Sequence, residues 1–177
     1  LSLGNYNGTI NIAGGLILSA DGNTLGTAEN IALGSTINAV SDLAITVNRS
    51  GGAPNARNKT IQQANFSNNG SLVSVSTLSG YGLEFTGTST FTGASTLGVV
   101  TASASNVVQG LTLSGVVSGG FDLVKSGLGT LALTNSGNTF GGAGKTIDVL
   151  NGVLSASSDG ALAVSYTHLT LPTKRIV

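Results

Sequence analysis

The sequence predicts an all-β fold, a parallel β-helix (β-solenoid) of about six to eight rungs. Three observations predict it. Apolar residues occur in short bursts at alternate positions, which is the pattern of half-buried strands. The 27 glycines are scattered among Ser, Thr and Asn, so turns are frequent. Aromatic residues make up only 5% of the chain, which is unlike the core of most β-sandwiches.

The expected strands follow one another along most of the chain, and each carries two or three apolar residues on one face. No long segment shows the three-four apolar spacing of a helix, and the Gly, Ser, Thr and Asn content lowers helix propensity. In chain order the bursts are Ile10 and Ile12, Leu16 and Leu18, Ile31 and Leu33, Leu43 with Ile45 and Val47, Val73 and Val75, Leu83 and Phe85, Leu111 and Leu113, Phe121 and Leu123, Leu131 and Leu133, and Ile147 and Val149.

Two architectures fit short strands separated by turns, an antiparallel sandwich or barrel and a β-solenoid. The very short strands, the few aromatics and the small turn residues favour the solenoid. Coils of roughly 20 to 30 residues set the expected number of rungs. One coil cannot bury its own apolar face, so we expect inward Leu, Ile and Val to form aligned ladders between coils. Outward Thr, Ser and Asn are then expected to form polar ladders.

The composition excludes several classes of function. The formal net charge is +0 and only 8% of residues are charged, so no electrostatic footprint for nucleic acid is present. Without Cys there is neither a disulfide framework nor a thiolate metal site. No stretch approaches the roughly 18 apolar residues of a membrane-spanning helix. The 177 residues fit one domain, and the start at Leu1 without a signal peptide indicates a fragment.

One segment, from Leu123 to Leu154, carries a recognisable motif, with Lys and two spaced glycines before Thr-Leu-x-Leu, then Asn-Thr-aromatic-Gly-Gly, then a closing Gly before Leu. The matching residues are Lys125, Gly127, Gly129, Thr130, Leu131, Leu133, Asn138, Thr139, Phe140, Gly141, Gly142, Thr146, Ile147, Gly152 and Leu154. This segment resembles the autotransporter-associated β-strand repeat. The preceding stretch, residues 110–123, resembles the coil that commonly precedes that repeat.

The resemblance implies a right-handed parallel β-helix, the passenger of an autotransporter exported across the outer membrane of a Gram-negative bacterium. A C-terminal outer-membrane β-barrel would follow in the full-length protein. Within the motif we expect Leu131 and Leu133 to point inward and Asn138 to form a left-handed or side-chain-capped corner. The stretch from Ala143 to Lys145 is longer than the usual pattern and predicts a bulged corner.

The C-terminal tail departs from this pattern. Its last residues read VSYTHLTLPTKRIV and include His168 and Pro172. The string resembles translated sequencing-adapter read-through, and the alternative is a final strand from Thr167 to Leu171. We therefore divide the chain into a β-helix passenger fragment, residues 1–164, and a non-native or disordered tail, residues 165–177.

Several motifs invite other functions. The stretch Gly141 to Thr146 reads GGAGKT, but Thr139 stands where a phosphate-binding loop needs its first Gly, and a strand rather than a helix is expected to follow. A calcium-binding nonapeptide would need Asp at Thr146. No GxSxG-like nucleophile motif is present. Five Asn-x-Ser/Thr sequons are expected by chance at Asn7, Asn48, Asn58, Asn65 and Asn69.

The acidic residues are widely spaced in the sequence, although distant residues of a solenoid can stack on one face. They are Asp21, Glu29, Asp42, Glu84, Asp122, Asp148 and Asp159. A convergence of two carboxylates with a basic residue in one groove would favour a carbohydrate-active β-helix enzyme, a polysaccharide lyase or hydrolase. The polar stretch Arg49 to Lys59 is expected to be a loop between coils and is the best candidate for a binding loop.

The sequence therefore favours a non-catalytic, structural or adhesive segment displayed at the cell surface. We expect no catalytic, cofactor-binding or metal-binding residues. Candidate partners are host or bacterial surface glycans, or other copies of the chain, through the polar ladders. The alternatives are the carbohydrate-active enzyme and a surface or filamentous β-helix protein that is not an autotransporter. The expected location is secreted or at the cell surface, anchored at the bacterial outer membrane.

Overall fold

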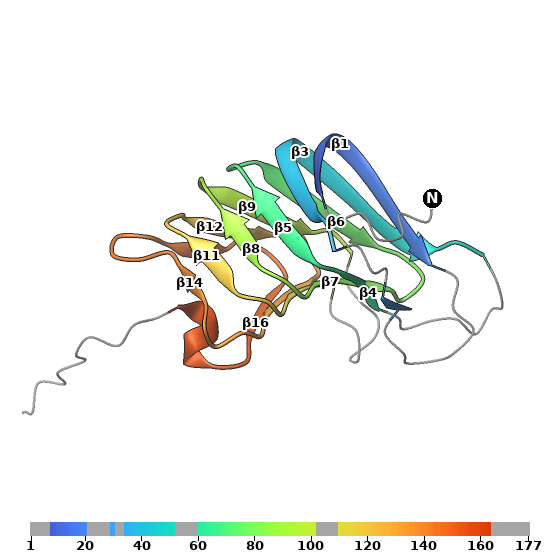
Figure 1. The fold of residues 1–177 in the computed structure, drawn as a ribbon. Coiled ribbons are helices and arrows are strands. Elements are labelled where there is room, and N and C mark those ends of the chain that lie inside the picture. Colours follow the sequence, from blue (N-terminus) through green and yellow to red (C-terminus); the bar gives the residue numbers. More distant parts are fainter. Residues whose placement is uncertain (1–7, 21–28, 31–33, 52–59, 102–109, 164–177) are drawn as a thin grey trace, which may run out of the picture.

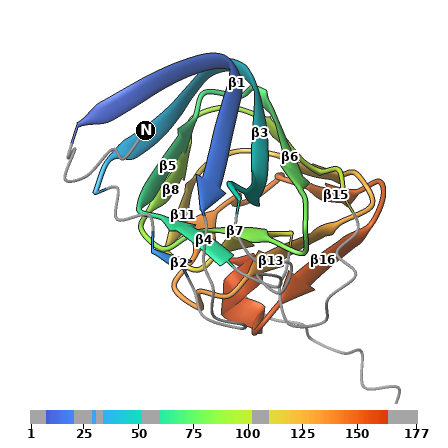
Figure 2. The same ribbon diagram turned by 90° about the vertical axis from the view of Figure 1, so that its right-hand side faces the viewer.

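The computed structural model describes residues 8–20, 29–30, 34–51, 60–101 and 110–163. These residues form a parallel β-solenoid with almost no helix, which confirms the predicted fold class. Every pair of neighbouring strands runs parallel. The strands lie side by side along the molecule in Figure 1, and Figure 2 shows the coils nearly end-on.

Each coil contributes a strand to each of three faces. The first face holds the opening halves of β1 and β3, followed by β5, β8, β11 and β14. The second face holds the closing halves of β1 and β3, followed by β6, β9, β12 and β15. The third face is the six-stranded sheet β2, β4, β7, β10, β13 and β16.

The strands of each face have the following bounds. On the first two faces they are β1 (Thr9–Ala20), β3 (Thr36–Arg49), β5 (Asn65–Asn68), β6 (Leu72–Thr77), β8 (Ser89–Phe91), β9 (Ser95–Val99), β11 (Val117–Gly119), β12 (Leu123–Ser126), β14 (Thr139–Phe140) and β15 (Ile147–Val149). On the third face they are β2 (Glu29–Asn30), β4 (Thr60–Gln63), β7 (Gly82–Phe85), β10 (Leu111–Leu113), β13 (Thr130–Leu133) and β16 (Val153–Ala156). A short 3-10 helix, η1 (Asp159–Leu162), follows β16.

Each face holds six described strands, of which four on the third face have a neighbour on both sides, so the solenoid has about four turns, slightly fewer than the six to eight rungs expected from the sequence. Coils with a neighbour on both sides occupy the middle of the stack. On the first face the last described strand, β14, has only two residues. The expectation was too high because it divided all 177 residues into coils of roughly 20 to 30 residues, whereas the described strands begin at Thr9 and end at Ala156.

Aliphatic ladders fill the interior, as the alternation predicts. On the third face Ile61, Leu83, Leu111 and Leu131 pair in register from coil to coil, and each is at most 2% exposed. Each buried aliphatic side chain contributes roughly 1.5–3 kcal/mol. Stacking of neighbouring coils therefore stabilises the fold.

Phenylalanine forms a second internal column. All five phenylalanines of the chain are buried, and their rings contact one another in sequence. The rings of Phe66 and Phe85 have centroids 4.8 Å apart, and those of Phe91 and Phe121 stack at 4.6 Å. Phe66 also meets Phe91 edge-on, and Phe121 stacks on Phe140. The phenylalanines are few, but they are concentrated in one continuous stack.

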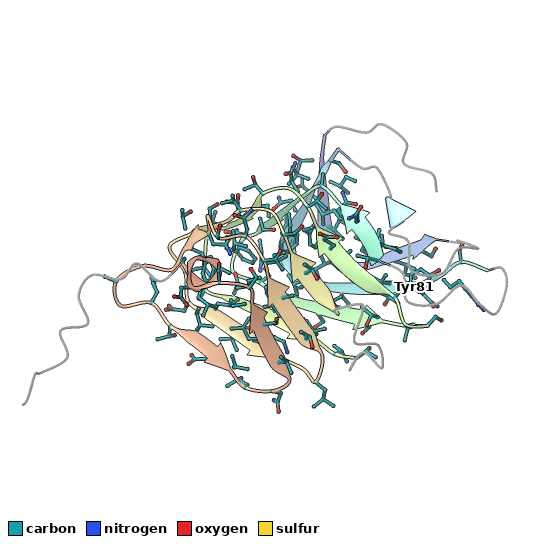
Figure 3. All side chains as sticks on the ribbon, turned by 90° about the horizontal axis from the view of Figure 1, so that it is seen from below. Tyr81 is labelled. Atoms are coloured by element: carbon teal, nitrogen blue, oxygen red, sulfur yellow. The ribbon has the colours of Figure 1, made fainter. Side chains whose placement is uncertain are left out.

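Most of the predicted strands are confirmed, from Ile10 to Val149, while Ile31 and Leu33 lie outside the described residues. Val149 belongs to β15 but is 47% exposed, because β15 is the last of the described strands on its face. The pattern of apolar bursts missed β4, β5, β8, β9, β11, β14 and β16, in which apolar residues are too few or too irregularly spaced to show a clear alternation. Tyr81, labelled in Figure 3, is buried directly after a turn. Its backbone amide closes this turn by donating to the carbonyl of Leu78.

Candidate functional site

A continuous row of uncharged polar side chains runs along the outside of the first face. It contains Asn11, Asn38, Ser67, Thr90, Ser118 and Thr139, which pair in register from β1 to β14. Parallel strands lie about 4.8 Å apart, so the six residues span about 24 Å along the solenoid axis. We call this set the polar row. It confirms the expected outward polar ladders.

The polar row divides into two parts by its hydrogen bonds. At the start, the Asn38 amide nitrogen donates to the Asn11 side-chain oxygen over 2.7 Å. The hydroxyls of Ser67, Thr90, Ser118 and Thr139 make no hydrogen bond to any group in the described part of the chain. This second part is therefore a regular row of four hydroxyls that are available to solvent.

The first face carries no charged side chain on its described strands. The charges lie elsewhere. Glu84 faces outward on the third face, where it accepts hydrogen bonds from the Gln62 amide at 2.9 Å and the Ser114 hydroxyl at 2.6 Å. Asp148 is on the second face, and Asp42 and Asp122 lie at corners. The first face is therefore electrostatically distinct from its neighbours.

Two aspartates hold equivalent corners between the first and second faces. Asp42 directly precedes the second-face half of β3, and its carboxylate accepts the amide of Leu72 in the next coil at 3.0 Å. Asp122 directly precedes β12 and accepts the amide of Thr146 at 2.9 Å. That hydrogen bond lowers the pKa of Asp122, and nearby Lys145 lowers it further while partial burial opposes both. Both carboxylates therefore stabilise corners of the coil stack.

Asp122 also lies in the densest cluster of charges. Its second oxygen is 3.5 Å from the Lys145 ammonium, and the Thr146 hydroxyl donates to Asp148 at 3.3 Å. The side chains of Lys145 and Asp122 are 37% and 39% exposed. The cluster lies on an exposed corner rather than in a groove. A shallow hollow of about 230 Å³ elsewhere on the surface is lined by one carboxylate, that of Asp42, and by no basic residue.

The buried cation is Lys125, which opens the repeat motif. It occupies an inward position in register with Leu97 of β9, and Leu97 is itself in register with Val73 of β6. Its side chain is 0% exposed. The ammonium donates to three backbone carbonyls, those of Ser126 at 2.7 Å, Gly127 at 2.8 Å and Asn151 at 3.1 Å. Burial lowers the pKa of Lys125.

Asn138, another motif residue, caps a corner with its side chain, as one of the two alternatives predicted. Its side-chain oxygen accepts the amide of Val117 at 2.8 Å, and its nitrogen donates to the carbonyl of Ala161 in η1 at 2.8 Å. It therefore joins the preceding coil to the segment after the last strand. The left-handed alternative is wrong, since Asn138 is not among the residues with positive φ.

The GGAGKT stretch is a corner, as predicted. It spans residues 141–146 between β14 and β15, whereas the equivalent corner before β12 spans residues 120–122. Gly141, Gly142 and Gly144 have positive φ, and the amide of Lys145 donates to the carbonyl of Gly142 at 3.1 Å. The corner projects from the body beside β14 in Figure 1, which agrees with the predicted bulge. A strand follows it, not a helix.

Other sequence candidates lie partly outside the described residues. Arg49 ends β3, but residues 52–59 of the predicted polar loop are not described. The tail, including His168, is also outside them, as are Asn7, Asn58 and Asp21. Within the described ranges, no group of three or more His, Cys, Asp or Glu residues could hold a metal ion. The same ranges contain no helix long and apolar enough to cross a membrane.

Sequence reasoning anticipated polar ladders but not which face would carry an uncharged one. Thr90 and Thr139 gave no local signal, because their partners in the row lie about 20 or more residues away. The pairing register alone aligns them. Comparison with family models, with curated proteins and with solved structures found no match to this chain.

Proposed function

We propose that this chain is a rigid, non-catalytic segment of a surface-displayed protein, with a structural or adhesive role, and that it is part of a Gram-negative autotransporter passenger. The observation that supports the proposal best is the polar row on an uncharged first face. A surface of this kind offers repeated hydrogen-bonding groups without attracting ions. It suits contact with other neutral polar surfaces.

Rigidity follows from the way the coils are held together. Every face is a parallel ladder, and one continuous core of aliphatic and aromatic side chains runs through the stack. Each coil contacts only its neighbours, so length can be extended by adding coils without changing the cross-section. Such a body holds a surface at a fixed distance from its point of attachment.

The arrangement of the carboxylates gives less support to the alternative function, a carbohydrate-active enzyme. Asp42 and Asp122 accept backbone amides at corners, and Glu84 is held by Gln62 and Ser114 on a flat face. The cluster of Asp122, Asp148 and Lys145 is exposed, whereas a glycosidase needs its two carboxyl groups on either side of a bound glycosidic bond. The carboxylates of Asp42, Asp122 and Glu84 therefore stabilise the coil stack. None of these described carboxylates forms a pair across a groove of the kind that a glycosidase needs.

The autotransporter assignment rests on the repeat motif from Leu123 to Leu154. Two of its residues have physical roles that depend on stacked coils, because Lys125 and Asn138 each bond across coils. Their presence supports a passenger that is secreted or held at the outer membrane. A C-terminal β-barrel is part of the proposal for the full-length protein.

Surface display can be tested in the source bacterium with an antibody against the purified chain. We expect labelling of intact cells and loss of the labelled protein when intact cells are treated with an external protease. Recovery of the protein only from the cytoplasmic fraction, protected from protease in intact cells, would overturn the proposal. Incubation of the purified chain with neutral and acidic polysaccharides should release no reducing ends or unsaturated products, and their release would favour the enzyme instead.

A further inference from the structure

The four free hydroxyls of the polar row point to one class of partner. We propose that the row from Ser67 to Thr139 binds an uncharged linear polysaccharide that lies along the solenoid axis. The inference rests on the proposed display function and deepens it by naming the partner. Three properties of the first face carry it, namely its charge, its hydrogen-bonding groups and its periodicity.

Charge comes first. An anionic or cationic polymer gains nothing on a face without charged side chains, because its ions lose water and meet no opposite charge. Each of the other two faces carries at least one carboxylate, Asp148 on the second and Glu84 on the third. A neutral partner is therefore favoured on the first face over a charged one.

The hydrogen-bonding groups narrow the class further. Hydroxyls both donate and accept, so a row of Ser and Thr can match a partner made of hydroxyls in any orientation. The described strands of the first face contain no Tyr or Trp, and the five phenylalanines are all buried in the core, so these strands offer no aromatic ring for stacking. Binding must then come from many weak hydrogen bonds to a hydroxyl-rich chain. Asn69 and Thr92 bond to each other at 2.9 Å and border this part of the row.

Periodicity argues for a linear polymer and fixes its direction. Ser67, Thr90, Ser118 and Thr139 present one hydroxyl per coil at about 4.8 Å intervals. That interval is comparable to the length of one sugar ring in an extended chain. A polymer laid along the axis can therefore repeat the same contact at each coil, and several weak contacts act together. A small sugar would make only one or two of them.

The test uses the purified chain of 177 residues and two soluble polymers of similar length, a neutral β-linked glucan and an anionic polygalacturonate. Binding is measured by affinity gel electrophoresis. We expect the glucan to retard the protein, with weak retardation by polygalacturonate that disappears in salt. Short oligosaccharides of two or three units should compete poorly on a molar basis, since affinity depends on the number of coils contacted.

Two matched variants test the site. The row variant carries Ser67→Ala, Thr90→Val, Ser118→Ala and Thr139→Val, which remove the four hydroxyls at outward positions. The control variant carries Ser74→Ala, Thr96→Val, Thr112→Val and Ser126→Ala on the other two faces. Circular dichroism and thermal unfolding establish that both variants fold. We expect the row variant to lose at least about tenfold in glucan affinity and the control variant to keep it.

The outcomes separate this inference from the display proposal. Absence of glucan binding by the unchanged chain, or equal loss in both variants, overturns the polysaccharide inference. Beads coated with the chain provide the second measurement. If they adhere to one another through the polar row while glucan neither binds nor competes, the partner is a second copy. The polysaccharide inference then fails while display stands. Strong binding of polygalacturonate in salt would also overturn the inference that the partner is an uncharged polysaccharide.

Discussion

At the residue scale, Lys125 is the one charged side chain buried in the interior of the described part of the coil stack. A lysine in an aliphatic column would be destabilising without partners, since an unpaired buried charge is costly. Three carbonyls from two successive corners supply those partners. The ammonium thus joins the coil that contains β12 to the coil that contains β16. This explains in physical terms why the motif begins with a residue of this length and charge.

Substitution of Lys125 by Met keeps the length of the side chain but removes its donors. We expect a loss of about 2–3 kcal/mol in the free energy of unfolding, because three partly buried carbonyls lose a charged partner. The measurement is chemical denaturation followed by circular dichroism. Lys145→Met is the control, since Lys145 is exposed, and it should change stability by less than about 0.5 kcal/mol. Equal effects from the two substitutions would contradict this role.

The same residue predicts a dependence of stability on pH. The folded state holds the pKa of Lys125 below its unfolded value of about 10.4. Between the two pKa values the unfolded chain binds more protons, so stability rises with pH through that window and is flat below it. Denaturation between pH 7 and pH 10.5 should show the rise in the unchanged chain and not in the Lys125→Met variant. A fall in stability between about pH 7 and pH 10.5, seen in the unchanged chain but not in the variant, would contradict a lowered pKa of Lys125.

At the scale of elements, glycines permit close contact between the corners of stacked coils. A Cβ on Gly115 would overlap the carbonyl oxygen of Gly87 in the coil before it. Gly115→Ala is therefore expected to destabilise the protein by about 1–3 kcal/mol. Gly15→Ala is the matched control, because nothing lies within 4 Å of its Cβ position and its φ is not in the left-handed region. The control should be neutral or stabilising by about 0.4–1 kcal/mol, as measured by thermal unfolding.

The phenylalanine stack joins the strands of successive coils. Phe91 touches both Phe66 and Phe121, so its removal interrupts the stack in the middle. Phe91→Ala is expected to cost about 3–5 kcal/mol. Leu128→Ala, at a position that is 68% exposed, should cost much less. If urea denaturation shows the two variants to be equally stable, the stack does not organise the core.

At the scale of the whole molecule, stability should vary along the solenoid axis. A coil in the middle is covered on both sides, whereas the last described coil is covered on one by the described strands. Val149 and Val153, in β15 and β16, are about half exposed, while Leu83 and Leu111 are buried. Hydrogen exchange measured by mass spectrometry should therefore show faster exchange in residues 147–156 than in residues 82–85 and 111–113. Uniform protection would mean that the solenoid opens only as one unit.

The alternation of apolar residues was sufficient to predict strands, and small corner residues were sufficient to predict a solenoid. Leu83 with Phe85 and Leu131 with Leu133 are clear examples, because alternation is a local property of one strand. β5 was missed because its sequence, NFSN, contains one apolar residue. Its burial depends on Phe66 meeting other phenylalanines from later in the chain. No local pattern reports such a contact.

The sequence by itself determined that the strands are short, which residues point inward in the strands with a clear alternation, the low charge content and the motif that contains Lys125 and Asn138. The tertiary structure alone decided which strands share a face, and thereby that Ser67, Thr90, Ser118 and Thr139 form one row. The physical reason is the register. Alternation is set within a strand, but the pairing of strands about 20 or more residues apart depends on corner lengths and on packing against neighbouring coils.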